Sequence, residues 1–336
     1  MKIIVTGGAG FIGSHILVEL LKKTNEIFVI DNFSNSSPNV FKKINEILNC
    51  DINFETIDLR NFYELKQFFS DIGPDLIIHL AGLKSVSDSN ENPLMYYENN
   101  VIGSINLLKA MDAVKCKNII FSSSATVYGV PQYLPLDENH PCRPTNTYGI
   151  TKLMVEEIIR DWCKTDNKKK SVILRYFNPI GAHASGLLGE NPFGTPNNLM
   201  PCITQVALGR LDKLKIYGND YKTNDGTGVR DYIHVVDLAQ GHLAAINFLK
   251  KCKGVEIFNL GRGYGYSVRE VLNSFEKISG IRIKWEICSR RTGDIEISYT
   301  DVKKSKKMLK WETSLNLNDM TKDAWNWQSK NPDGYK

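Results

Sequence analysis

Short apolar runs alternate with segments of helical period along the first half of the chain. The runs typical of buried strands lie at residues 2–5, 27–30, 52–57, 76–80, 118–128 and 172–177. Between the first two of them, Ile16, Leu17, Leu20 and Leu21 recur at helical spacing. Strands that alternate with helices in this way predict βαβ units and an α/β fold with a doubly wound parallel sheet.

The pattern changes after Gly181. Gly, Pro and Asn are dense between residues 186 and 198, and this stretch has neither helical nor strand period. We therefore expect two parts, a nucleotide-binding domain of the Rossmann type over residues 1–180 and a smaller substrate lobe over residues 181–336. Since no low-complexity linker separates them, we expect the two parts to pack as one unit.

The first strand runs directly into a glycine-rich turn and then into a helix, which is the context of a dinucleotide fingerprint. Gly8, Gly10 and Gly13 fit the spacing GxGxxG, while Gly7, Gly10 and Gly13 fit the wider GxxGxxG. The second strand ends in Asp31, where a carboxylate can accept hydrogen bonds from an adenosine ribose and repel a 2′-phosphate. Residues 32–39 contain no arginine that could receive such a phosphate. The sequence therefore predicts a site for NAD rather than NADP.

Composition excludes several classes of protein. A hydrophobic content of 42% with 24% charged residues is ordinary for a soluble globular chain, and a net charge of +5 argues against a dedicated nucleic-acid binder. No apolar run approaches the length of a membrane span. The seven cysteines are scattered without a CxxC pair or zinc spacing, so we expect reduced thiols, no metal site and a cytoplasmic location.

Tyr148 and Lys152 lie one helical turn apart in a predicted helix and therefore share one face. A free tyrosine, with a pKa of about 10, is too weak a base at neutral pH. A lysine ammonium and the positive charge of a nicotinamide could lower this pKa by roughly three units, which requires about 4 kcal/mol. Ser124, in the serine cluster at the end of a predicted strand, is the candidate for orienting the same hydroxyl.

These features together resemble the extended short-chain dehydrogenase/reductase family. Further motifs resemble the UDP-galactose 4-epimerases within that family, at residues 121–129, 175–183, 196–201, 218–221 and 225–234. The resemblance covers essentially the whole chain. It implies an isomerase that interconverts UDP-glucose and UDP-galactose through a 4-keto sugar, with Tyr148 as the base and transient hydride transfer to a bound NAD. It also implies a homodimer.

The resemblance assigns the site residues as well. For NAD it implies contacts with Gly7, Gly10, Phe11, Ile12, Gly13, Asp31, Asn32, Phe33, Ser34, Asn35, Ser36, Asp58, Leu59, Leu80, Ala81, Gly82, Lys84, Asn99, Ser124, Tyr148, Lys152 and Phe177. For the UDP-sugar it implies contacts with Lys84, Ser124, Tyr148, Asn178, Asn198, Leu199, Lys215, Ile216, Tyr217, Arg230, Tyr232, Arg291, Asp294 and Ser298. Two arginines suit a diphosphate, and Asn198 is predicted at a helix N-terminus, where anions bind.

One position bears on the choice of sugar. Where the family has either a bulky tyrosine or a small residue beside the C2 substituent, counting from Asp294 gives Ser298. A serine leaves room for an N-acetyl group, so we expect UDP-N-acetylglucosamine and UDP-N-acetylgalactosamine to be substrates too. The alternatives are that Ser298 faces elsewhere or that Tyr299 fills the gap.

Two other functions remain as alternatives. A nucleotide-sugar 4,6-dehydratase would share the fold, but such enzymes place an Asp-Glu pair directly after a threonine, where this chain has Ser124-Ala125-Thr126. A non-catalytic NAD-binding sensor is the second alternative, and the presence of Ser124, Tyr148 and Lys152 argues against it.

Overall fold

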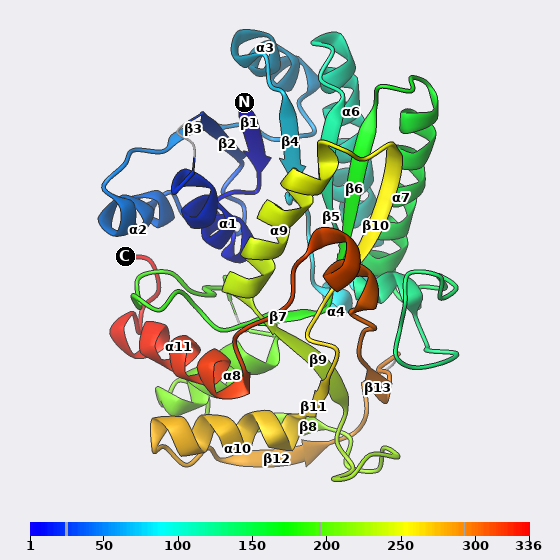
Figure 1. Ribbon diagram of the computed structural model, residues 1–336. Coiled ribbons are helices and arrows are strands. Elements are labelled where there is room, and N and C mark those ends of the chain that lie inside the picture. The colour runs from blue at the N-terminus through cyan, green and yellow to red at the C-terminus, as the bar shows by residue number, and fades with distance from the viewer. Residues whose placement is uncertain (24–25, 195, 292) are drawn as a thin grey trace.

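In the part of the chain that the computed structural model describes, residues 1–23, 26–194, 196–291 and 293–336, seven strands form one parallel sheet (Figure 1). Along the sheet the order is β10-β6-β5-β4-β1-β2-β3. These strands are β1 (Ile3–Thr6), β2 (Ile27–Asp31), β3 (Asn53–Thr56), β4 (Leu76–His79), β5 (Asn118–Ser124), β6 (Lys170–Tyr176) and β10 (Gly254–Leu260). The order reverses between β1 and β4, so the predicted doubly wound sheet is confirmed and its ligand crevice is expected at that reversal.

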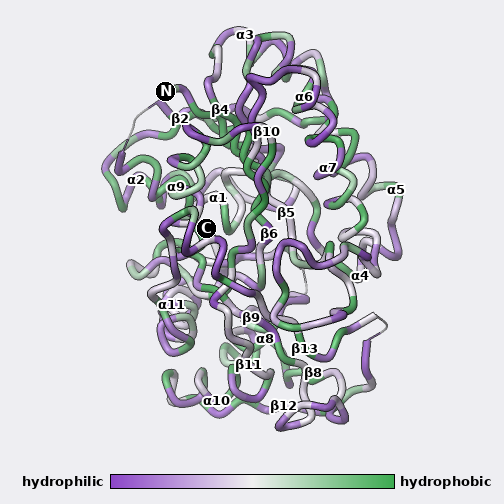
Figure 2. The backbone as a smooth tube through the Cα atoms, turned by 45° about the vertical axis from the view of Figure 1, so that its right-hand side comes forward, coloured by the Kyte–Doolittle hydropathy of each residue, from purple (hydrophilic) through white to green (hydrophobic). Residues whose placement is uncertain are grey.

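Helices cover both faces of the sheet. On one face lie α1 (Phe11–Leu21), α2 (Asn39–Leu48) and α9 (Val235–Leu249), and on the other lie α3 (Phe62–Ile72), α6 (Gly103–Ala113) and α7 (Thr147–Lys164). Both faces of the central strands are therefore buried, which explains their nearly continuous apolar sequences. The hydrophobic stretches gather along these strands in Figure 2.

The helical segment between β4 and β5 is interrupted. It consists of α5 (Pro93–Tyr96), a π-helical segment (Tyr97–Ile102) and α6, and it is preceded by α4 (Val86–Glu91). The buried Asn100 lies in the π-helical segment, where its side chain bonds to the backbone of Leu83 and to Thr151. An irregular turn of this kind is common at functional sites.

The smaller lobe lies at the carboxyl end of the sheet (Figure 1). Its strands form two small sheets, one of β7 (Asn178–Ile180), β9 (Val229–His234), β11 (Gly265–Ser267) and β13 (Ile297–Ser298), the other of β8 (Leu214–Tyr217) and β12 (Trp285–Cys288). Three helices complete it, α8 (Leu199–Ala207), α10 (Val268–Ser279) and α11 (Leu317–Lys330).

The expected boundary at residue 180 needs a correction. After β9 the chain returns to the large part of the molecule, where α9 covers the sheet and β10 pairs in parallel with β6. Residues 235–260 therefore belong to the large part of the molecule, although the sequence-based prediction assigned them to the lobe. The lobe is built from the segments on either side of this return.

The sequence also predicts reduced cysteines and no membrane-spanning segment. All seven cysteines are free. Among the described residues, none of the helices is both long and apolar enough to span a membrane.

Candidate functional site

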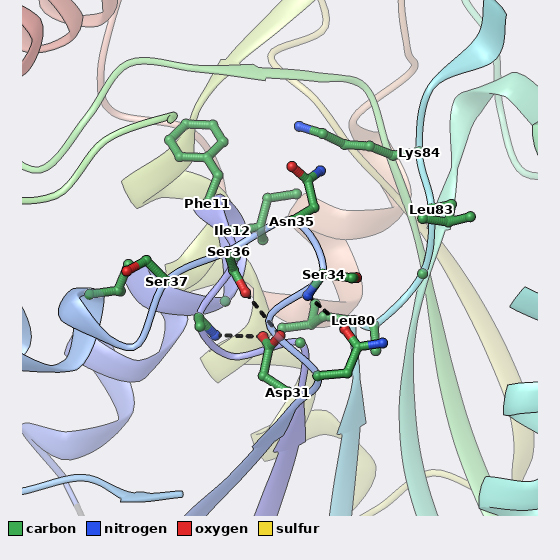
Figure 3. A pocket seen from close by; sticks show the side chains of 18 of the residues that line it. Phe11, Ile12, Asp31, Ser34, Asn35, Ser36, Ser37, Leu80, Leu83 and Lys84 are labelled. Carbon is green, nitrogen blue, oxygen red and sulfur yellow. Dashed lines mark hydrogen bonds between the residues drawn. The ribbon is translucent and has the colours of Figure 1, made fainter. Parts of the chain in front are cut away.

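A pocket lies at the carboxyl edge of the large sheet, at the reversal between β1 and β4 (Figure 3). Its walls come from the glycine turn after β1, the loop after β2, Asp58 and Leu59 after β3, and residues 80–84 after β4. Most of the residues predicted to contact NAD line this pocket, which brings together segments far apart in the sequence.

The structure distinguishes the two glycine motifs. Gly7 has a φ of 70°, and a Cβ atom there would lie 2.8 Å from the backbone of Ala81. At Gly13 a Cβ would lie only 2.3 Å from the carbonyl oxygen of Gly7, so both glycines make the tight turn possible. Gly8 does not line the pocket, and its missing Cβ makes room for Val29. The motif is therefore the wider one, Gly7, Gly10 and Gly13.

Gly10 precedes α1 and lines the pocket. A Cβ atom on Gly10 would lie 3.3 Å from the carbonyl oxygen of Gly7 and would have no other neighbour within 4 Å among the described residues outside its own turn. The first N–H groups of α1 have no partners within the helix and carry the positive end of its dipole. A bare backbone beside such a terminus fits the pyrophosphate of a dinucleotide.

Asp31 ends β2 with its carboxylate beside this turn (Figure 3). One carboxylate oxygen accepts from the backbone N–H of Ala9 at 3.0 Å. The other accepts from the N–H of Phe33 and from the hydroxyl of Ser36, both at 2.9 Å. These three bonds fix the carboxylate and leave lone-pair capacity for a ribose hydroxyl, since a carboxylate has about four acceptor sites.

A neighbouring arginine is neutralised. Arg60 donates to both carboxylate oxygens of Asp58, at 3.0 and 2.8 Å, and Asn32 also donates to Asp58. The Arg60 guanidinium holds the pKa of Asp58 well below its usual range. Arg60 is thus paired, and the pocket keeps the acidic character at Asp31 that favours NAD over a 2′-phosphorylated dinucleotide.

The backbone after β4 is held in place by hydrogen bonds to polar side chains rather than by apolar packing. The hydroxyl of Thr6 accepts from the N–H of Leu80 at 3.2 Å, and Asn100 binds both the N–H and the C=O of Leu83. A Cβ at Gly82 would lie 3.0 Å from the Asn100 amide oxygen. This backbone therefore forms a fixed wall of the pocket.

Tyr148, Lys152 and Ser124 meet beside this wall. Asn146 caps α7 by accepting from the N–H of Gly149, which places Tyr148 in the first turn and Lys152 on the same face. The Lys152 ammonium donates to the carbonyl of Ser122 at 2.8 Å and lies 5.9 Å from the centre of the Tyr148 ring. The Ser124 hydroxyl accepts from the backbone N–H and the side chain of Thr126, and it lies near enough to Tyr148 to lower the pKa of that tyrosine.

These groups adjoin the cofactor pocket. Ser122, which accepts from Lys152, lines the pocket, and the Lys152 ammonium lies 3.7 Å from the place of a Cβ on Gly82. The candidate base and the predicted cofactor site therefore form one continuous site.

Burial shifts both pKa values away from the charged forms. It raises the pKa of Tyr148 to about 12, an effect that the nearby Ser124 hydroxyl opposes. It lowers the pKa of Lys152 to about 8, an effect that the charge of Glu156 opposes. Of the two cations expected to lower the pKa of Tyr148, Lys152 alone is therefore not sufficient.

A second polar cluster lies in the lobe. Arg230 on β9 and Arg291 both donate to Asp294, at 3.1 and 3.3 Å, through different carboxylate oxygens. The Arg291 guanidinium also stacks on the ring of Tyr217, 4.7 Å from its centre. Two arginines held side by side by one carboxylate and one aromatic ring could grip a diphosphate.

The strands of the lobe align the other predicted substrate residues. Asn178 on β7 is paired with Tyr232 on β9, and Ser298 on β13 is paired with Arg230. Lys215 and Tyr217 project from β8, whereas the Ile216 side chain is buried in the core of the lobe and only its backbone is available to a ligand. Asn198 and Leu199 begin α8.

Some residues differ from the sequence prediction. Phe177 does not line the described pocket; its side chain packs with Val127, Tyr128 and Leu136. Conversely, residues 189–193 and Tyr335 line the pocket from the lobe side, although the sequence did not predict them as cofactor contacts. No local pattern marks them, because the 186–198 stretch has no regular period and Tyr335 lies far away in sequence.

Comparison with known proteins gives matches over the whole chain. A UDP-glucose 4-epimerase from Bacillus subtilis (strain 168) is 50% identical over 336 residues, covering 100% of this chain and 99% of the relative. The crystal structure of a Bifidobacterium longum UDP-glucose 4-epimerase in complex with NAD+ and UDP has a TM-score of 0.96 and 47% identity, covering 99% of this chain and 100% of the other. A UDP-Glc/GlcNAc 4-epimerase from Campylobacter jejuni has a TM-score of 0.85 and 38% identity, covering 98% of this chain and 99% of the other.

The family model that matches is described as the NAD dependent epimerase/dehydratase family and covers residues 3–261, from the first strand to the end of β10. It spans the glycine turn, Asp31, and the cluster of Tyr148, Lys152 and Ser124, all of which fit NAD as the cofactor. On the match, the fold and the geometry of this pocket, the chain belongs to the NAD dependent epimerase/dehydratase family.

Proposed function

We propose that this chain is an NAD-dependent UDP-hexose 4-epimerase that interconverts UDP-glucose and UDP-galactose. The observation that carries the proposal is the position of Tyr148 beside Lys152, whose ammonium lies next to Gly82 of the cofactor pocket. The arginine pair of the lobe supplies the second half of the site. The descriptions of the Bacillus subtilis and Bifidobacterium longum relatives support the same activity.

In the proposed reaction Tyr148 accepts the proton of the sugar 4-hydroxyl and later returns it. Ser124 orients the same hydroxyl, and Lys152, with its charge close to the Tyr148 ring, stabilises the phenolate. NAD, when bound, supplies the reversible oxidation at C4. Because Tyr148 both takes and returns the proton, the protein needs no separate acid for the second half of the reaction.

Inversion at C4 requires the oxidised sugar to turn over while the nucleotide stays in place. Arg230 and Arg291 would hold the diphosphate by charge-assisted hydrogen bonds, which are stronger than bonds between neutral groups. Their common partner Asp294 fixes both guanidinium groups before the substrate arrives. The lobe thus grips the UDP and leaves the hexose free to rotate.

We also propose that N-acetylated UDP-hexoses are substrates. Ser298 is paired with Arg230, and a small side chain beside the C2 substituent would leave room for an N-acetyl group. The relative from Campylobacter jejuni, described as a UDP-Glc/GlcNAc 4-epimerase, supports this wider specificity within the family.

The test uses purified protein without added cofactor. UDP-galactose and UDP-N-acetylgalactosamine are supplied separately, and the C4 epimers are followed by NMR. Conversion of both sugars is the expected result and would support both proposals. Conversion of the unacetylated sugar alone would refute the wider specificity only.

Two outcomes would overturn the epimerase proposal itself. If neither sugar were converted even after NAD is supplied, the chain would be a sensor that binds NAD without catalysis. If a 4-keto-6-deoxy product accumulated, it would be a 4,6-dehydratase.

We further propose a homodimer. Several apolar side chains are exposed on the face formed by α4 to α7 with the π-helical segment, among them Leu94 (75% exposed), Ile102 (47%) and Met154 (44%). Exposed apolar clusters of this kind mark interfaces in soluble proteins. Sedimentation of the wild-type protein should give a dimer and that of Leu94→Glu a monomer; a monomeric wild type would refute the proposal.

A further inference from the structure

A segment of the lobe forms part of the wall of the cofactor pocket. Residues 189–193 and Tyr335 all line it, although none of them belongs to the large sheet or its connecting loops. We call residues 189–193 the strap. Its attachments to the rest of the molecule determine how firmly it covers the pocket.

Tyr335 holds the first residue of the strap. Its hydroxyl accepts from the N–H of Gly189 and donates to the C=O of the same residue, both at 2.8 Å. The ring of Tyr335 packs near Trp327 of α11, with ring centres 5.7 Å apart. A Cβ at Gly189 would lie 2.3 Å from the Trp327 ring, so only glycine allows this close contact. The start of the strap is therefore fixed on α11 and the segment after it.

Glu190 ties the strap to both halves of the site. Its side chain is 9% exposed, and the same carboxylate oxygen accepts from Lys84 and from Asn198, each at 2.9 Å. Lys84 follows β4 on the cofactor side, and Asn198 directly precedes α8 in the lobe. A buried carboxylate needs such partners, because an unpaired charge away from water is costly.

The far end of the strap reaches the loop after β2. The N–H of Phe193 donates to the side-chain oxygen of Asn35 at 3.3 Å, and Asn35 lines the pocket. Between the two ends, Asn191 packs against Gly334, where a Cβ would lie 2.4 Å from its side chain. The strap is thus attached at both ends and in the middle.

We propose that Tyr335 and Glu190 are positioning residues of the cofactor site, which hold the strap across the pocket and so slow the release of NAD. The proposal deepens the proposed function and rests on it, since an epimerase has to keep the same cofactor through both halves of its reaction. Neither residue takes part in proton transfer. Their expected effect is therefore on the residence time of NAD rather than on the chemical step.

The experiment measures exchange of bound NAD. Wild type and variants are loaded with NAD and mixed with an excess of isotopically labelled NAD, and the label bound to protein is followed by mass spectrometry. Tyr335→Phe keeps the ring against Trp327 but removes both hydrogen bonds to Gly189. We expect NAD to exchange about tenfold faster, as for the loss of one or two neutral hydrogen bonds.

Glu190→Gln tests the strap from its other attachment and serves if Tyr335→Phe fails to fold. It keeps the size of the side chain and removes the ion pair with Lys84, whose own side chain is 49% exposed. We expect about two- to fivefold faster exchange. Tyr63→Phe is the matched control, because Tyr63 is 83% exposed on α3.

Faster exchange in either strap variant, with none in Tyr63→Phe, would support the proposal. Exchange at the wild-type rate in both strap variants would overturn it. Turnover of UDP-galactose at saturating NAD is measured alongside, and that of the control Tyr63→Phe should be close to wild type. Absence of turnover in the wild type would refute the epimerase function, whereas the exchange rates would still test the strap.

Discussion

Ser298 lies opposite Arg230 in the parallel register of β13 and β9. Paired residues of neighbouring strands project to the same face of a sheet, and consecutive residues to opposite faces. Ser298 therefore shares the face of Arg230, while Tyr299 projects to the other face, where it lies near Gly265. The register thus favours Ser298, not Tyr299, as the residue facing the sugar.

Ser298→Tyr should narrow the substrate range. The larger ring would occupy the space proposed for the N-acetyl group, and overpacking of this kind typically costs about 1–3 kcal/mol. We expect kcat/KM for UDP-N-acetylgalactosamine to fall by roughly tenfold or more, with UDP-galactose little affected. Tyr299→Phe is the control and should leave the ratio of the two values unchanged. An equal loss for both sugars in Ser298→Tyr would contradict the assignment.

Tyr148→Phe should abolish turnover without releasing the cofactor. Removing a general base typically lowers the rate by about 10²–10⁴-fold. The phenyl ring keeps the packing, so the NAD content of the purified variant should equal that of the wild type. Epimerisation assays and the NAD content of the denatured protein check both parts. Unchanged turnover would show that another group removes the proton.

The two pocket glycines Gly7 and Gly10 should respond differently to alanine. Gly10→Ala should fold, because its Cβ would meet only the carbonyl of Gly7, but the methyl group should obstruct the pyrophosphate and weaken NAD binding. Gly7→Ala combines a φ of 70° with a contact of 2.8 Å to Ala81. It should lower the free energy of unfolding by roughly 1–3 kcal/mol. Denaturant unfolding with and without NAD distinguishes the two effects; equal stability losses would contradict this reading.

Arg291→Gln should weaken the binding of UDP more than the chemical step. Hydrogen bonds to charged groups contribute about 1.5–3 kcal/mol, so we expect the Kd for UDP to rise by roughly 10- to 100-fold, with a similar change in KM. Calorimetric titration with UDP checks this. Arg282→Gln is the control, since the Arg282 side chain is 93% exposed. A collapse of kcat at unchanged KM would instead place Arg291 in the chemistry.

The free energy of unfolding should decrease as the pH drops below about 6.5, the pKa of a free histidine. Burial lowers the pKa of His15 and of His79 to about 3, and that of His242 to about 4. The unfolded chain therefore binds more protons as the pH falls from about 6.5 toward 4, and the contribution of these neutral histidines is fully present only above this window. Each of these histidines should change the free energy of unfolding by about 1.4 kcal/mol per pH unit, and the three together by roughly 4 kcal/mol per pH unit.

Urea unfolding at pH 7, 6 and 5 measures that slope. His15→Gln should reduce it by about one third, because the buried His15 ring would no longer be available to titrate on unfolding. An unchanged slope in this variant would show that carboxyl groups, not His15, determine how the free energy of unfolding decreases at acid pH.

The sequence was informative wherever function depends on contiguous residues. The strand, turn and helix at Gly7–Gly13 carry their chemistry in one short stretch, and so do Asp31 at the end of β2 and the pair Tyr148 and Lys152 on one helix face. Local spacing decides these features, and the structure has them as expected. Even here the choice between Gly7 and Gly8 required the contacts with Ala81 and Val29.

Features that depend on distant partners could not be predicted in this way. Glu190 is defined by Lys84 and Asn198, and Tyr335 by the backbone of Gly189, so neither has a local signature. The interrupted helix at Asn100 follows from bonds to Leu83 and Thr151 rather than from its own sequence. The pairing of β10 with β6 is likewise decided by packing between segments that are far apart.

That last pairing has a consequence for how the chain is made. When β6 (Lys170–Tyr176) leaves the ribosome, its outer neighbour β10 (Gly254–Leu260) has yet to be synthesised. Until it appears, the nascent sheet presents an open hydrogen-bonding edge, which is the feature most prone to pair with another chain. The lobe segment from β7 to β9 and the helix α9 must emerge during that interval, so chaperones that shield this edge would matter most in the middle of translation.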